Sequence, residues 1–200
     1  MRFGARRKAQ GVGIAVLAMS FALAGCGTGT KLGGADVAKK VLPPGESLPA
    51  ELRTVADKPS SRPLAAKKCS YFSDTPGGWC KDAVAAGDAG YRSSDKSRTA
   101  RFHVVVYRSD TAARKAFRLW GPYVRNSSTK YQVLNAETLG SESVAFAGNK
   151  DWTRDDQKLV IHQGQFIGTV EYRGSTAQGT ADPTLIKLAK MFTERMRQGD

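Results

Sequence analysis

Residues 99–108, with the sequence TARFHVVVYR, decide the fold. If this stretch is a β-strand, Phe102 and Val104 lie on one face and Val105 and Tyr107 on the other, because side chains alternate along a strand. Apolar residues on both faces indicate a strand that is buried on both sides. The stretch is therefore predicted to be a central strand of its sheet.

Two helices are predicted after this strand. Residues 109–111 form a Ser-Asp-Thr cluster of N-cap residues, and apolar residues recur at helical spacing over 112–120. The Gly-Pro pair at 121–122 is expected to end or kink that helix. The Asp-Pro pair at 182–183 starts the second helix with a capping residue and a proline at the first helical position, and Gly199 ends it.

Several short strands are predicted between the helices. Residues 130–136 and 143–147 are two candidates, and residues 158–162 and 166–172 are predicted to form a hairpin. Gly164 suits the first position of a type II′ turn between the last two. This order of elements predicts an α+β fold, with an antiparallel β-sheet and helices packed on one face.

The segment before these elements has weaker signals. Residues 36–42 are expected to form one or two helical turns, which the Pro-Pro pair at 43–44 ends. Prolines at positions 49, 59 and 63 are expected to keep the following chain extended.

The first 25 residues are predicted to be a signal peptide. A basic start with Arg6 and Arg7 precedes an uncharged apolar run over 11–22, which is shorter than the 20 or so residues that span a bilayer. The Leu-Ala-Gly-Cys sequence at 23–26 is similar to a lipobox, the site where bacterial lipoproteins are acylated on cysteine and cleaved. Cys26 is therefore the predicted lipidation site. An ordinary secretory signal and an uncleaved anchor helix are the alternatives.

The chain divides into three parts on this interpretation. Residues 1–25 are the lipoprotein signal peptide, residues 26–34 a lipidated tether, and residues 35–200 one α+β domain. The signal holds four of the 31 Lys and Arg and none of the 18 Asp and Glu, so the remainder has a formal charge of +9. A positive surface beside a membrane favours anionic lipids and wall polymers. A merely solvated basic surface is the alternative, and an exported protein is not expected to bind nucleic acid.

Cys69 and Cys80 are the two cysteines that remain after Cys26. An even pair in an oxidising compartment predicts a disulfide. Closing a loop of this size would contribute about 2–3 kcal/mol in the chain-entropy model. A metal site would need further ligands, and no histidine lies between the two cysteines. The spacing also differs from the C-x-x-C of redox pairs.

No catalytic site is predicted. His103 and His162 each fall in a predicted strand among apolar residues, which is typical of half-buried histidines. Neither has a cysteine or carboxylate pattern that would complete a metal site. Adjacent Asp155 and Asp156 in a polar loop are more typical of solvated turn residues than of a catalytic pair. No cofactor is expected either, because the sequence contains no phosphate loop and no dinucleotide-binding motif.

Aromatic residues and nearby arginines suggest a binding hypothesis. Rings offer apolar area and arginine holds phosphate or carboxylate, so such a mixture suits lipid or glycan ligands at the edge of a cleft. The alternative is that these rings fill the core and cover the sheet edges. The residues concerned are Trp79, Trp120, Tyr123, Trp152 and Tyr172, with Arg118, Arg125, Arg154 and Arg173.

Several segments together resemble extracellular sensor-like domains of actinobacterial lipoproteins and receptor serine/threonine kinases. They are VVVYRSD at 104–110, LGSESVA at 139–145 and VIHQGQFI at 160–167, followed by the long final helix. The entry segment, VLPP at 41–44 and LP at 48–49, is also similar. The resemblance spans most of the chain after the signal. It differs in one respect, because the kinase sensors have two disulfides and this chain can form one.

The resemblance implies a domain that senses or binds a ligand through a cleft on its sheet, and it provides no ligand-binding residues to transfer. We therefore expect a non-catalytic envelope lipoprotein, anchored through Cys26 on the extracytoplasmic face of the cell membrane. Its expected partners are the membrane, through the covalent lipid, and an anionic envelope lipid, a glycan, a wall polymer or an envelope protein. An envelope enzyme or enzyme accessory subunit with an unrecognised site is the alternative.

Overall fold

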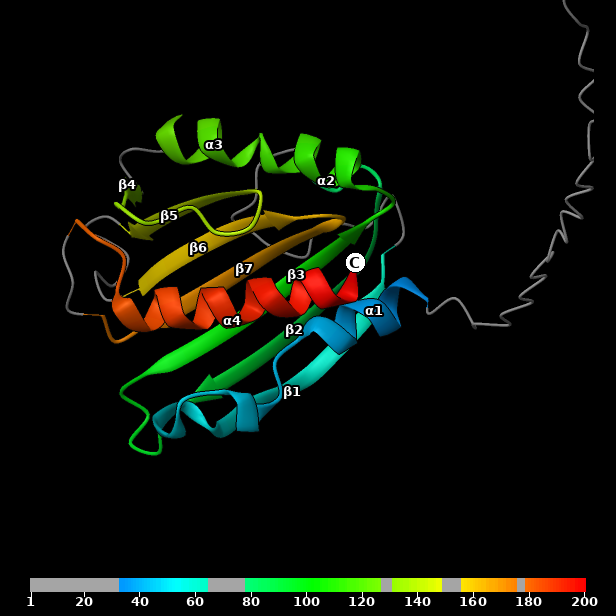
Figure 1. The fold of residues 1–200 in the computed structure, drawn as a ribbon. Helices are drawn as coiled ribbons and strands as arrows, with labels where there is room; N and C mark the ends of the chain where they lie inside the picture. The colour runs from blue at the N-terminus through cyan, green and yellow to red at the C-terminus, as the bar shows by residue number, and fades with distance from the viewer. Residues whose placement is uncertain (1–32, 65–77, 127–130, 149–155, 176–178) are drawn as a thin grey trace, which may run out of the picture. The chain divides into compact units, whose positions relative to one another are not determined.

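The computed structural model describes residues 33–64, 78–126, 131–148, 156–175 and 179–200. A seven-stranded antiparallel sheet, with the strand order β1-β2-β3-β7-β6-β5-β4, forms its centre (Figure 1). The strands are β1 Thr54–Pro63, β2 Ala83–Arg92, β3 Thr99–Tyr107, β4 Tyr131–Val133, β5 Glu142–Gly148, β6 Asp156–Gln163 and β7 Phe166–Arg173. The helices are α1 Gly34–Val41, α2 Asp110–Phe117, α3 Trp120–Asn126 and α4 Pro183–Gly199, with 3₁₀ turns η1 Gly45–Ser47 and η2 Ala50–Leu52.

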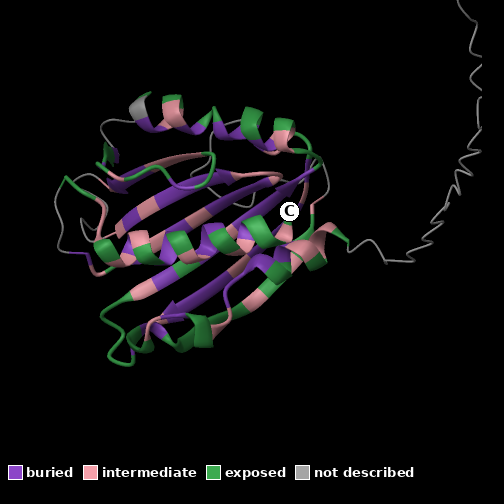
Figure 2. Ribbon diagram, in the orientation of Figure 1, coloured by how far each residue is buried: buried purple, intermediate pink, exposed green. Residues whose placement is uncertain are grey.

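Strand β3 has the central position that its sequence predicts. It lies between β2 and β7, and its side chains enter two separate apolar clusters. Phe102 and Val104 belong to the cluster under α1 and α4, whereas Val105 and Tyr107 belong to the cluster under α2 and α3. All four side chains are buried, as the purple of the central strands shows in Figure 2.

The predicted α+β class and antiparallel sheet are confirmed, but the expectation that all helices share one face is wrong. Helices α1 and α4 cover one face, and α2 and α3 pack against part of the other (Figure 1). The physical reason lies in β3 itself, because apolar side chains on both of its faces need a covering layer on each side.

The predicted turns and caps are confirmed at three places. The Ser109 hydroxyl accepts a hydrogen bond from the amide of Ala112 at the start of α2. Asp182 caps α4 in the same manner, through the amide of Thr184 at 2.7 Å. Gly164 has a φ of +54° between β6 and β7, which the first position of a type II′ turn requires.

Strands β1 and β2 are absent from the sequence-based prediction, which treats the first as extended chain and does not identify the second. Alanine and glycine dominate β2, and both residue types are poor strand formers. Their small size serves the packing of α1 instead. A Cβ added at Gly87 would lie 3.1 Å from Leu42 Cδ1 and 3.0 Å from the Ser60 carbonyl oxygen. Pro59 and Pro63 fit β1 because it is an edge strand.

The predicted signal peptide at 1–25 and the lipidation site Cys26 lie outside the described residues, as does most of the predicted tether at 26–34. These assignments stay predictions. Within the part of the chain that the structure describes, no helix is both long enough and apolar enough to cross a membrane.

Candidate functional site

The half of the α2–α3 side of the sheet that the helices do not cover carries polar side chains. Directly paired residues on neighbouring antiparallel strands point to the same face, so the strand register places these side chains together. One row across the sheet contains Asp88, His103 and Thr169, and the next contains Arg101, Glu171 and Lys158. We call this surface the polar sheet face and define it by Asp88, Arg92, Thr99, Arg101, His103, Asp156, Lys158, Thr169, Glu171 and Arg173.

Ion pairs hold the carboxylates of β6 and β7 on the polar sheet face. Lys158 Nζ lies 2.8 Å from Glu171 Oε1. Arg173 binds both carboxylate oxygens of Asp156, with Nε at 2.7 Å and Nη2 at 2.9 Å. The two ion pairs therefore hold the side chains of neighbouring strands β6 and β7 in fixed positions on this face.

His103 lies in the row of the polar sheet face that borders the cluster under α2 and α3, and it is half-buried. Burial lowers the pKa of His103, while the carboxylates of Glu171 and Asp88 act in the opposite direction. The imidazole is consequently neutral at neutral pH, with one nitrogen that donates and one that accepts a hydrogen bond. The face thus combines a neutral hydrogen-bonding ring with flanking charges of both signs.

His162, the other candidate histidine, has a different environment and is fully buried. Its Nε2 lies 3.1 Å from Asp110 Oδ1 and 3.1 Å from the Gly164 carbonyl oxygen. Because both neighbours are acceptors, Nε2 carries a hydrogen and donates it. Arg114 also contacts Asp110, at 3.1 Å, and approaches Glu142 at 3.9 Å. This cluster fixes the start of α2 to the β6–β7 turn, and a fully buried ring cannot touch a ligand.

The two histidines do not form a joint site. His103 pairs with Thr169 in the register, and His162 pairs with Ile167. Strand β7 lies between the two strands that carry the histidines. Among the described residues, no group of three or more His, Cys, Asp or Glu side chains could hold a metal ion.

The aromatic residues of the binding hypothesis do not line one cleft. Trp79 and Trp120 are buried in the cluster under α2 and α3, and Tyr123 packs against that cluster. Tyr172 is buried in the other cluster, on the opposite face of the sheet. Trp152 and Arg154 lie outside the described residues, as does the side chain of Arg125. The core interpretation of the described rings is therefore correct.

Of the two cysteines of the predicted disulfide, Cys80 lies within the described residues and Cys69 lies outside them. Cys80 lies just before β2 and is partly buried against the cluster under α2 and α3. The turn beside it is fixed by Tyr107, whose hydroxyl donates to the Trp79 carbonyl oxygen at 2.8 Å. Cys69 lies outside the described residues, so its pairing with Cys80 stays a prediction.

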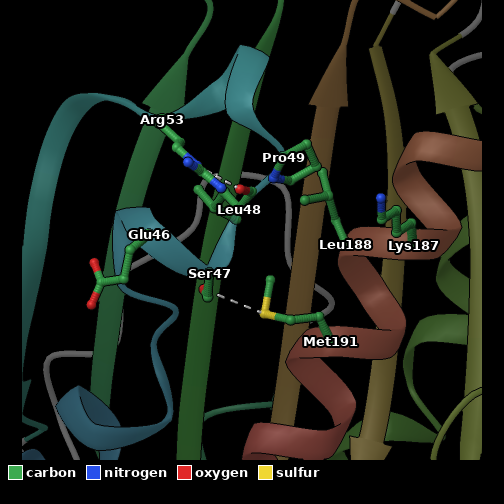
Figure 3. Close-up of a pocket in the computed structure, with 8 residues that line it drawn as sticks. All are labelled: Glu46, Ser47, Leu48, Pro49, Arg53, Lys187, Leu188 and Met191. Carbon is green, nitrogen blue, oxygen red and sulfur yellow. Dashed lines mark hydrogen bonds between the residues drawn. The ribbon is translucent and has the colours of Figure 1, made fainter.

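A cavity of about 260 Å³ lies on the α1–α4 side, between η1, η2 and α4 (Figure 3). Its wall is mixed: Leu48, Pro49, Leu188 and Met191 line it together with Glu46, Ser47, Arg53 and Lys187. Arg53 points toward Leu48 in Figure 3, and its Nε donates to the Leu48 carbonyl oxygen at 3.0 Å. Because that bond fixes the turn between the two 3₁₀ segments, Arg53 has a structural role at this cavity.

The polar sheet face is a feature that the sequence analysis does not identify, although a signal for it exists. The sequence TVEYR at 169–173 alternates polar and apolar residues, and its polar residues Thr169, Glu171 and Arg173 all fall on the face. Alternation of this kind is typical of a strand with one buried side and one side open to water.

Comparisons with known proteins give a similarity in structure and none in sequence. No family model matches the chain, and no curated protein sequence matches it. The extracellular domain of PknH from Mycobacterium tuberculosis is similar in structure, with 11% sequence identity and a TM-score of 0.48. That similarity covers 72% of this chain and 86% of the PknH domain. At this identity and score, it assigns neither a family nor a ligand to the chain.

Proposed function

We propose that this protein is a cell-envelope lipoprotein, anchored to the membrane through Cys26, whose domain binds a ligand or partner on the polar sheet face. Binding is its role, in the manner of an extracellular sensor, and it carries out no catalysis. The location that goes with this function is the extracytoplasmic face of the cell membrane.

One observation carries this proposal: the uneven covering of the two sheet faces. Helices α1 and α4 bury the strands on one face, whereas α2 and α3 stop short on the other and leave half-buried polar side chains there. Among these, His103 and Thr169 are half-buried hydrogen-bonding groups on central strands. Polar groups that converge on a rigid sheet are well placed to orient a ligand.

The charge of the polar sheet face restricts the kind of ligand. Its carboxylates alternate with cations, and two of them form ion pairs. The ion-paired part of this face does not offer the long run of phosphate contacts that dominates binding to nucleic acid. A polar envelope molecule or a protein partner fits it better, and the lipobox at 23–26 supports a protein that meets such molecules.

Ligand-induced thermal stabilisation tests the proposal. The full-length protein in neutral detergent would be mixed with envelope lipids, glycans, wall polymers and envelope-protein fractions, and its melting temperature measured. At a ligand concentration about 100 times Kd, the expected increase is about 5–10 °C. His103→Ala should abolish that increase, because it removes the half-buried hydrogen-bonding ring on the central strand β3.

Lys187→Ala is the matched control, because Lys187 lies on α4, on the opposite side of the sheet. This variant should keep the full increase in melting temperature. The proposal is wrong if no fraction stabilises the protein. It is also wrong if Lys187→Ala abolishes the increase as completely as His103→Ala does.

A further inference from the structure

Three arginines gather at the end of the polar sheet face that lies next to the β2–β3 hairpin. Arg92, Thr99 and Arg173 form one row across β2, β3 and β7, because Thr99 pairs with both arginines in the register. Arg101 lies two residues further along β3 and pairs with Gly90. Diagonal neighbours of this kind have backbones about 7–8 Å apart, within reach of long side chains.

The three arginines at this end of the face differ in whether a carboxylate forms an ion pair with them. Arg173 is engaged by Asp156. In the described residues, neither Arg92 nor Arg101 has a carboxylate within ion-pair distance. Arg101 is exposed and Arg92 is half-buried. These two arginines therefore keep charge and hydrogen-bond donors for a ligand, which arginine uses well with phosphate groups.

Two further carboxylates lie close to these arginines. Asp95 accepts hydrogen bonds from Ser93 and Ser97 within the hairpin, and those bonds lower its pKa to about 2. Its oxygens are therefore occupied by the hairpin itself. Asp57 lies over Gly90, because a Cβ at Gly90 would be 2.6 Å from Asp57 Oδ2. Asp57 is thus the carboxylate that opposes an anion beside Arg101.

We propose that Arg92, Arg101 and Thr99 form a subsite for the phosphodiester group of an anionic envelope molecule, which a wall polymer and a lipid headgroup both carry. The inference rests on the proposed function and specifies its ligand class. The two arginines bind a phosphodiester, the Thr99 hydroxyl donates to it, and Arg173 with Asp156 forms one border of the subsite.

Binding of fluorescent poly(glycerol phosphate) to the full-length protein in neutral detergent, measured by anisotropy, tests this subsite. The variant Arg92→Gln with Arg101→Gln should weaken binding by about tenfold or more, because it removes both charge-assisted contacts. The control Lys115→Gln with Arg118→Gln makes the same change of charge on exposed positions of α2 and its C-cap. It should weaken binding by less than about twofold. Asp57→Asn should tighten binding by about threefold, because it removes the opposing charge.

Three results would overturn the subsite: no binding of the polymer to the wild-type protein, equal weakening by both double variants, or no gain from Asp57→Asn. Phosphatidylglycerol added to the micelles distinguishes the two sources of phosphate. Competition at equal phosphate concentration assigns the subsite to a lipid headgroup, and a lack of competition assigns it to the polymer. If a neutral glycan stabilises the protein through His103 while the polymer does not bind, the phosphate subsite is wrong and the proposed function stands. If no probe binds, both are wrong.

Discussion

Phe192→Ala is expected to lower the free energy of unfolding by about 3–5 kcal/mol. Phe192 is fully buried on α4, and its ring meets that of Phe102 on β3 edge to face, with centroids 5.4 Å apart. Alanine removes the apolar contacts and leaves a cavity that the surrounding sheet cannot close, because α4 is packed along its whole length. Urea unfolding followed by circular dichroism measures the change.

Met191→Ala is the control for this prediction. Met191 is the preceding residue on the same helix, but it is only partly buried at the border of the core. Its truncation is expected to cost about 1 kcal/mol. A cost for Phe192→Ala below that of Met191→Ala would show that α4 does not pack on the sheet as described.

Gly168→Val is expected to destabilise the protein by about 3 kcal/mol, for the opposite reason. A Cβ at Gly168 would lie 2.8 Å from both Met196 Sδ and Phe192 Cε1. The added methyl groups must therefore displace the buried side chains of Met196 and Phe192 at the contact between α4 and β7. Thermal unfolding measures the loss, and Gly168→Ala should give a smaller one.

Combining Gly168→Ala with Met196→Ala tests the cause of that loss. Met196 is fully buried, and its truncation opens space next to the position of the new Cβ. The double variant should therefore be more stable than the sum of the two single changes predicts. Additive losses would contradict close contact between β7 and α4.

The sequence predicts the half of the fold in which apolar periodicity is strong. The alternation in β3, the turn glycine at Gly164 and the Asp182 cap each specify a local structure without help from distant residues. The residues of β2 do not specify a strand by themselves. Its alanines and glycines are small because α1 packs closely against this strand. That approach involves Leu42, about 45 residues away in the chain, and no local pattern reports it.

The candidate site was predictable only in part, for a similar reason. His103 is identified as a candidate because histidine is rare in this chain. Its companions on the polar sheet face come from four strands, and their proximity follows from the register between those strands. The predicted arrangement, with all helices on a single face, also gives no indication of the site. It leaves the whole second face open and does not divide it into a covered part and a polar part. The structure instead covers half of that face with α2 and α3 and leaves the other half polar.

The intact mass of the protein from its native host, with and without reduction, tests most directly the claim that it is a lipid-anchored envelope protein. The predicted result is a chain that begins at Cys26, carries the added mass of a diacylglyceryl group, and gains two hydrogens on reduction of the Cys69–Cys80 disulfide. A chain that keeps Met1, or that begins elsewhere without lipid, would contradict the anchor. It would thereby remove the main support for a role at the envelope surface.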